Sequence, residues 1–93
     1  MATGPAASEE WSVFARELGH NLRRARAARD LTQERLVEIA GISLYAYQQY
    51  ERGTVTHGGE PTNPRLATML AIGQALDVGL QDLLPPVPRL IVR

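Results

Sequence analysis

The chain has 93 residues, an apolar content of 44% and a formal net charge of zero, which favours a single small globular domain. It contains no cysteine, so disulfide bonds and thiolate metal sites are excluded. No apolar run in the sequence is long enough to span a membrane. The first residues lack the charged and apolar regions of a signal peptide, so we expect a cytoplasmic protein.

The first predicted element is a helix from about Glu9 to Ala28. Ser8 is a suitable N-cap, and two acidic residues follow it at the positive end of the helix dipole. Apolar residues recur along this segment at spacings of three and four, namely Trp11, Phe14, Ala15, Leu18, Leu22 and Ala25. The residues before the helix, 1–7, are small, and we expect them to be flexible.

Two short helices joined by a tight turn are predicted over residues 31–53. Thr32 and Ser43 are suitable N-caps for the two helices. Gly41 and Gly53 follow their last turns, where a residue with positive φ commonly ends a helix. A helix, a short turn with glycine and a second helix make a helix-turn-helix unit, which needs the rest of the chain to cover its apolar faces.

The downstream part of the chain is predicted to hold two more helices. A loop over residues 54–63 contains two glycines and a proline. Asn63 then caps a helix that begins with Pro64, and a short fifth helix covers about residues 80–84. The tail, 85–93, is expected to be either a disordered end or a short strand that pairs with a second copy of the chain.

Two sequence stretches flank the helix-turn-helix unit. They read Leu18-Gly19-x-x-Leu22-Arg23-x-x-Arg26 before it and Pro64-x-Leu66-x-x-Met69-x-x-Ile72-Gly73 after it. Together with the unit, they resemble the lambda-repressor/Cro (XRE-type) family of DNA-binding domains over about residues 16–84. The resemblance implies an all-α, five-helix bundle in which residues 8–84 form the domain. Two predicted elements exceed the family pattern: the first helix is about two turns longer than usual, and the loop between helices three and four is several residues longer.

Three residues depart from the family pattern. Asp30 and Asp77 stand where the family prefers glycine after helices one and four, and aspartate tolerates the left-handed conformation better than most residues. Val37 stands where the family has a small alanine. We therefore expect the helix crossing to open slightly or Tyr47 to move.

The resemblance also implies phosphate contacts. Gln33, at the start of the second helix, matches a glutamine that holds a DNA phosphate at a helix N-terminus. Thr32 and Ser43 occupy neighbouring cap positions. Arg52, at the end of the third helix, matches a position that contacts the DNA backbone.

A structural ion pair is expected in the interior. Arg26 follows Leu22 by four residues, on the inward face of the first helix, so its charge needs a partner. The resemblance implies that Glu51 is that partner.

The third helix offers side chains suited to reading DNA bases. We expect Ala46, Tyr47 and Tyr50 to face inward. The outer face then carries Leu44, Tyr45, Gln48 and Gln49. The exposed N-terminal part of such a helix enters the major groove. There glutamine can pair with adenine, while leucine and tyrosine can contact a thymine methyl group.

We therefore predict a sequence-specific DNA-binding transcriptional regulator that acts as a homodimer on double-stranded DNA and needs no cofactor. A repressor is the simplest form, because blocking a promoter requires no further contact. No side chains converge as catalysis requires, so we do not expect an enzyme. His57 and Glu60 share one loop, but a single such pair is weak support for a metal site. We expect self-contact through Leu83–Val92, with Trp11 and Phe14.

The alternative is a protein–protein interaction module, or an antitoxin-like partner protein, that uses the same fold. Its apolar surface would comprise Trp11, Phe14, Ile39, Leu44 and Tyr45. The neutral net charge favours this alternative, because DNA-binding domains are typically basic. The polar outer face of the third helix favours DNA.

Overall fold

The computed structural model describes residues 4–91 and contains five α-helices. They are α1 (Glu9–Ala28), α2 (Gln33–Ala40), α3 (Leu44–Arg52), α4 (Leu66–Leu76) and α5 (Leu80–Leu83), preceded by a 3-10 turn, η1 (Pro5–Ala7). The described residues form no strand, and the predicted all-α, five-helix fold is confirmed. Residues 1–3 of the N-terminus predicted to be flexible, and residues 92–93 of the tail, lie outside the described residues.

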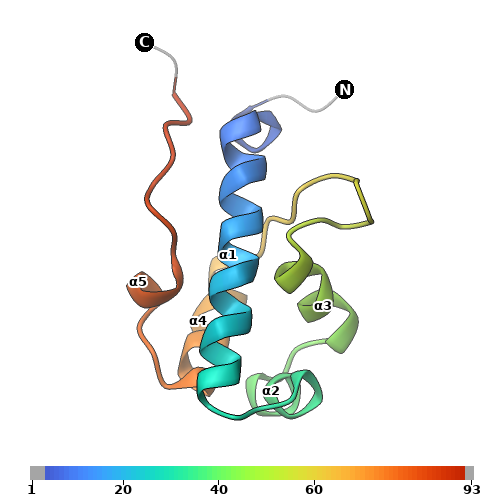
Figure 1. Cartoon of the computed structure of the whole chain (residues 1–93), viewed down its shortest axis with the longest axis vertical. Helices are drawn as coiled ribbons and strands as arrows, with labels where there is room; N and C mark the ends of the chain where they lie inside the picture. Colours follow the sequence, from blue (N-terminus) through green and yellow to red (C-terminus); the bar gives the residue numbers. More distant parts are fainter. Residues whose placement is uncertain (1–3, 92–93) are drawn as a thin grey trace.

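The central element of the fold is α1. Figure 1 shows α3 on one side of it, α5 and the tail on the other, and α4 and α2 completing the bundle. Ser8 caps α1 as predicted, because its Oγ accepts a hydrogen bond from the backbone N–H of Trp11 at 3.1 Å. The inward face of the helix buries Leu18 and Leu22. This helix is therefore the support against which the helix-turn-helix unit is placed.

One hydrophobic core joins all five helices. Its buried members are Phe14, Leu18, Leu22, Leu36, Val37, Tyr47, Met69, Ile72, Leu76 and Leu83. Val37 is 8% exposed and belongs to the same cluster as Tyr47, which is fully buried. The core therefore accommodates the larger side chain at position 37. Among residues 4–91, no helix has the length and apolar character needed to cross a membrane.

The caps of the helix-turn-helix unit are as predicted. Thr32 Oγ1 accepts a hydrogen bond from the Arg35 backbone N–H, and Ser43 Oγ accepts one from the Ala46 backbone N–H, both at 3.0 Å. Each cap satisfies one backbone donor that the first helical turn leaves unpaired. The two helices therefore start at positions that their own sequence specifies.

Two aspartates end helices in the left-handed conformation. Asp30 follows α1 with φ 55°, and Asp77 follows α4 with φ 58°. These are the only two non-glycine residues with positive φ in the described part of the chain. The prediction that aspartate takes the place of the family's glycine at both points is confirmed.

The predicted start of α4 is wrong. The helix begins at Leu66 with Arg65, in extended conformation, as its N-cap residue, and Asn63 and Pro64 precede it outside the helix. The reason is tertiary: the Thr62 backbone N–H donates to the Gly53 carbonyl oxygen at 3.0 Å. This hydrogen bond fixes the chain directly before Asn63 and Pro64, where the local sequence favours a helix start, and these two residues are not helical.

The loop after α3 folds back on itself as a short hairpin. Residues 54–61, called here the 54–61 hairpin, are closed by an isolated antiparallel bridge between Thr54 and Pro61. Within it, the Val55 backbone N–H donates to the Glu60 carbonyl oxygen at 2.8 Å. The long loop predicted from the sequence is thus an ordered projection beside the C-terminal end of α3 (Figure 1).

Trp11 attaches the residue that follows the 54–61 hairpin, Thr62, to α1. Its indole Nε1 donates to the Thr62 carbonyl oxygen at 3.1 Å, and its ring stacks on Phe14 with centroids 5.1 Å apart. Phe14 is buried and Trp11 is half-buried. Of the two interpretations of these aromatic residues, covering the domain's own surface is the one that the contacts support.

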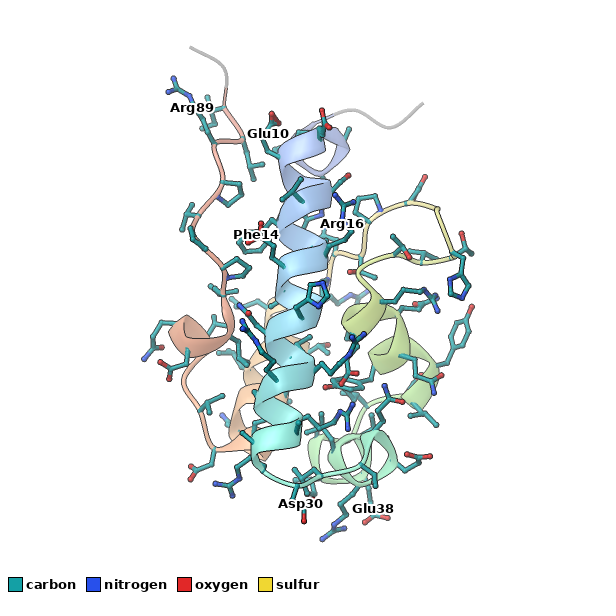
Figure 2. The ribbon with its side chains drawn as sticks, in the orientation of Figure 1. Glu10, Phe14, Arg16, Asp30, Glu38 and Arg89 are labelled. Atoms are coloured by element: carbon teal, nitrogen blue, oxygen red, sulfur yellow. The ribbon has the colours of Figure 1, made fainter. Side chains whose placement is uncertain are left out.

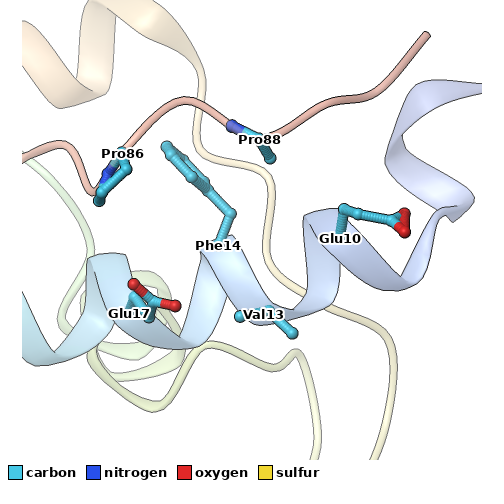
Figure 3. A pocket seen from close by; sticks show the side chains of 6 residues that line it. All are labelled: Glu10, Val13, Phe14, Glu17, Pro86 and Pro88. Atoms are coloured by element: carbon cyan, nitrogen blue, oxygen red, sulfur yellow. The ribbon is translucent and has the colours of Figure 1, made fainter.

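The chain after α5 runs back along α1. The helix ends at Leu83, one residue earlier than predicted, because Leu84 is extended before Pro85, as a residue preceding proline prefers. Pro85 is buried, and the Phe14 ring points toward the tail between Pro86 and Pro88 (Figure 3). Residues 84–91 therefore form an irregular segment packed on the chain's own first helix.

Candidate nucleic-acid interface

The exposed face of α3 is formed by Tyr45 and Gln48. Tyr45 is 70% exposed, and Gln48 is also exposed. Gln49 is half-buried, as is Leu44, which packs against the core. The prediction that Leu44 points outward is wrong. Leu44 lies one turn before Tyr47, on the inward side of α3. The face of α3 that a large partner can reach therefore consists mainly of Tyr45 and Gln48, not of all four predicted residues.

Gln33 connects this face to the interior. Its Nε2 donates to Glu51 Oε1 at 3.0 Å, and its Oε1 accepts a hydrogen bond from Gln48 Nε2 at 3.3 Å. Gln33 is half-buried at the first position of α2, next to the exposed cap Thr32. The turn between α2 and α3 thus brings together two of the predicted DNA-binding glutamines, one from each helix.

The interior end of this connection is an ion pair between Arg26 and Glu51. Arg26 Nε donates to Glu51 Oε2 at 2.7 Å and Arg26 Nη2 to Oε1 at 3.1 Å. Arg26 Nη1 also donates to the Leu31 carbonyl oxygen at 2.9 Å. A bidentate pair of this kind fixes both side chains, so it joins α1, the α1–α2 turn and α3.

The electrostatics of the pair follow from burial and from these hydrogen bonds. Burial alone would raise the pKa of Glu51, but the hydrogen bonds from Arg26 and Gln33 outweigh it, and the pKa lies below its ordinary value. Burial raises the pKa of Tyr47, and the nearby Glu51 carboxylate adds to this. The Tyr47 hydroxyl makes no hydrogen bond of ordinary geometry within the described residues. Because its pKa is lowered, the buried Glu51 side chain is ionised at neutral pH.

Gln49 and Arg52 hold the 54–61 hairpin. Gln49 Nε2 donates to the Val55 carbonyl oxygen at 3.0 Å, and Arg52 Nη2 donates to the same oxygen at 2.8 Å. Arg52 Nε also lies 3.2 Å from the Thr54 carbonyl oxygen. Both side chains, expected to contact DNA, are thus engaged within the chain. No feature of the local sequence indicated these contacts, because they depend on the course of the loop.

Two arginines of α1 flank α3 and were missed as candidate site residues. Arg16 lies against the end of α3, since its Cα is 2.8 Å from the position that a Cβ on Gly53 would occupy. Arg23 lies two turns further along, with its Nε 3.8 Å from Glu51 Oε1. Both are exposed, and Figure 2 shows Arg16 on the side of α1 nearer α3. Their spacing of seven residues, on the side of α1 that carries Gly19, is the signal that could have found them.

A metal-binding site would require several ligand side chains to lie together in the described residues. They contain no group of three or more histidine or acidic side chains placed to hold a metal ion. His57 and Glu60 are both exposed on the 54–61 hairpin. The arrangement around α2 and α3 presents hydrogen-bonding amides, hydroxyls and guanidinium groups.

Comparisons with known proteins agree with this geometry. The sequence model of a family described as "helix-turn-helix domain" matches residues 17–85. The chain is also similar to the restriction-modification controller protein C.AhdI from Aeromonas hydrophila, with a TM-score of 0.64 and 28% sequence identity. That alignment covers 74% of this chain and 94% of the other. No curated protein sequence shows a significant match. The resemblance to lambda-repressor/Cro-type domains is confirmed, and the chain belongs to the helix-turn-helix domain family.

Proposed function

We propose that the chain is a DNA-binding transcriptional regulator that inserts α3 into the major groove. The observation that carries this proposal is the exposed pair Tyr45 and Gln48 on the outer face of α3, beside the N-terminus of α2. A short helix of this kind, with side chains free at its N-terminal part, is suited to contacting base edges. Membership of the helix-turn-helix family and the similarity to a restriction-modification controller protein support the same function.

Backbone contacts are assigned to the starts of α2 and α3 and to α1. Thr32, Gln33 and Ser43 lie where unpaired backbone N–H groups and the helix dipole favour a phosphate. Arg16 and Arg23 add exposed positive charge beside α3. Arg52 contributes through the 54–61 hairpin, which it holds in place. This distribution offsets the absence of net positive charge in the whole chain.

Base contacts are assigned mainly to Tyr45 and Gln48. A glutamine amide can donate to N7 and accept from N6 of adenine, and the tyrosine ring can contact a thymine methyl group. Leu44 and Gln49 take smaller parts, because Leu44 packs on the core and Gln49 is bonded to Val55.

We further propose a homodimer on a palindromic site, acting as a repressor. One short recognition helix contacts few base pairs, so two copies bound about 34 Å apart, one turn of DNA, would provide a specific site. Occupying a promoter in this way blocks transcription without any additional contact.

The test is selection of bound sequences from a random DNA pool, followed by affinity measurements at several salt concentrations. The expected result is one enriched palindromic motif and an affinity that falls steeply with salt, because phosphate contacts release counterions. Arg16→Ala should weaken binding to all sequences, while Tyr45→Ala and Gln48→Ala should relax the motif. An unenriched pool would rule out sequence-specific binding by this chain.

The alternative is an interaction module that binds another protein. Exposed apolar side chains favour it, notably Leu66 at 65%, Val87 at 88% and Ile39 at 47% exposure. Phe14, part of the surface first considered for it, is buried and does not contribute. The same salt series distinguishes the two functions, because an apolar protein interface gains rather than loses strength as salt rises.

A further inference from the structure

A continuous set of hydrogen bonds runs from the buried Glu51 carboxylate to the exposed face of α3. The Glu51 side chain is 3% exposed. Gln33 Nε2 donates to Glu51 Oε1, and Gln48 Nε2 donates to Gln33 Oε1. The three residues belong to two helices. Glu51 is buried, Gln33 is half-buried and Gln48 is exposed.

The carboxylate fixes the orientation of the first amide. An ionised carboxylate only accepts hydrogen bonds, so Gln33 must turn its NH2 group toward Glu51. The bidentate pair with Arg26 keeps that carboxylate ionised and in place. The carbonyl oxygen of Gln33 is therefore left on the other side, where it can only accept.

The orientation of the second amide follows from the first. Because Gln33 Oε1 is an acceptor, Gln48 must turn its NH2 group toward it. One N–H and the carbonyl oxygen of Gln48 then remain for another partner. A donor and an acceptor side by side are what the adenine edge requires in the major groove.

We propose that Glu51 and Gln33 are positioning residues that hold the Gln48 amide in one orientation for base readout. The proposal rests on the proposed function. An exposed glutamine loses side-chain entropy when a contact fixes it, and a held amide has lost part of it before DNA arrives. The buried ion pair thus takes part in sequence preference as well as in the fold.

The first experiment compares sequence preference, not affinity alone. Gln33→Ala, Gln48→Ala and the double variant are used to select sites from a random DNA pool. All three should lose preference at the same base pair, by about tenfold for each single variant, with no further loss in the double variant. Gln49→Ala, on the same helix but outside the set, should add to Gln33→Ala independently. If Gln33→Ala weakens all sequences equally and keeps the motif, the proposal is overturned.

The second experiment needs no DNA. In the free protein, the side-chain NH2 resonances of Gln48 should move in Gln33→Ala and in Glu51→Gln, but not in Glu38→Gln, whose side chain is exposed. Gln33→Ala leaves the Arg26–Glu51 pair intact, so this variant remains informative if Glu51→Gln does not fold. Unmoved Gln48 resonances in Gln33→Ala would overturn the positioning role. A wild-type protein that selects no DNA sequence would instead overturn the proposed function itself.

Discussion

Gly19 of α1 lies directly against the backbone of Glu51 in α3. A Cβ atom at position 19 would be 2.7 Å from the Tyr50 carbonyl oxygen and 2.9 Å from the Glu51 carbonyl carbon. Only glycine permits this approach, so the crossing of α1 and α3 is set by a missing side chain. The same crossing brings Arg26 within reach of Glu51, two turns further along α1.

Gly19→Ala should therefore destabilise the domain. The obstructing atoms are backbone and cannot rotate away, so we expect about 1–3 kcal/mol, the cost of overpacking a tight contact. The measurement is the midpoint of urea unfolding followed by circular dichroism. His20→Ala, at the exposed neighbouring position, serves as the control and should leave the midpoint nearly unchanged. Equal midpoints for the two variants would show that the helices can separate freely.

Glu51→Ala should destabilise the protein far more than Glu38→Ala. Removing Glu51 leaves Arg26, whose side chain is only 18% exposed, without its carboxylate partner. Breaking a fully buried pair costs about 3–5 kcal/mol, and the partial exposure of Arg26 places this one near the lower end. Glu38 is 70% exposed and pairs only with Arg35 on the surface, so its loss should cost below about 1 kcal/mol. Thermal unfolding of both variants decides the comparison, and matching melting temperatures would contradict it.

The stability contributed by Glu51 should disappear in acid. Its pKa in the folded protein lies below the ordinary value of 4.5, so the unfolded chain binds a proton first as the pH falls. The contribution is complete above about pH 4.5 and is lost as the pH falls through the folded pKa. Melting temperatures between pH 7 and pH 3 should fall less steeply for Glu51→Gln than for the wild type. A wild type and variant with parallel pH dependence would exclude Glu51 as the responsible group.

Arg52→Ala should loosen the 54–61 hairpin. The variant loses the hydrogen bonds to the carbonyl oxygens of Val55 and Thr54, at a cost of about 1 kcal/mol each. Hydrogen exchange of the Val55 amide, which bonds to Glu60 within the hairpin, should accelerate. Arg29→Ala, at the far end of α1, is the matched control. Unchanged exchange at Val55 would mean that Gln49 alone holds the hairpin.

If the chain forms a homodimer through its tail, the contact must use residues that remain exposed. Leu83 and Phe14 are buried in the core, so the expectation that they contribute is corrected, whereas Val87 and Ile91 are 88% and 62% exposed. The double variant Val87→Glu, Ile91→Glu should sediment as a monomer where the wild type is a dimer, because buried carboxylates oppose association. Its circular dichroism should match the wild type. A variant that remains dimeric would place the contact elsewhere.

Much of the fold could be predicted because the relevant signals are local. Ser8, Thr32 and Ser43 cap helices through their own side chains, and these caps place the starts of α1, α2 and α3. The start of α4 could not be predicted in this way. Asn63 and Pro64 favour a helix, but Thr62 is tied to Gly53 in a contact that no local pattern reveals.

The candidate site was only partly predictable for the same reason. Helical spacing places Tyr45 and Gln48 outward. The same spacing places Leu44 on the inward side with Tyr47, where it packs against the core, so the prediction that Leu44 faces outward is wrong. The engagement of Gln49 with Val55 depends on how the long loop turns back after α3. Helical spacing shows which residues of α3 share a face, but it does not show that the 54–61 hairpin folds back onto Gln49.

The attachment of Trp11 has a practical consequence for following this protein in solution. The chain has one tryptophan, and its indole is stacked on Phe14 and bonded to the segment that links α3 to α4. Tryptophan fluorescence, excited at wavelengths where the three tyrosines do not absorb, therefore comes from a single defined place, where α1 meets that segment. Release of the indole into water should shift the emission to longer wavelength without any attached label. The protein thus contains its own optical probe for detachment of the loop beside α3.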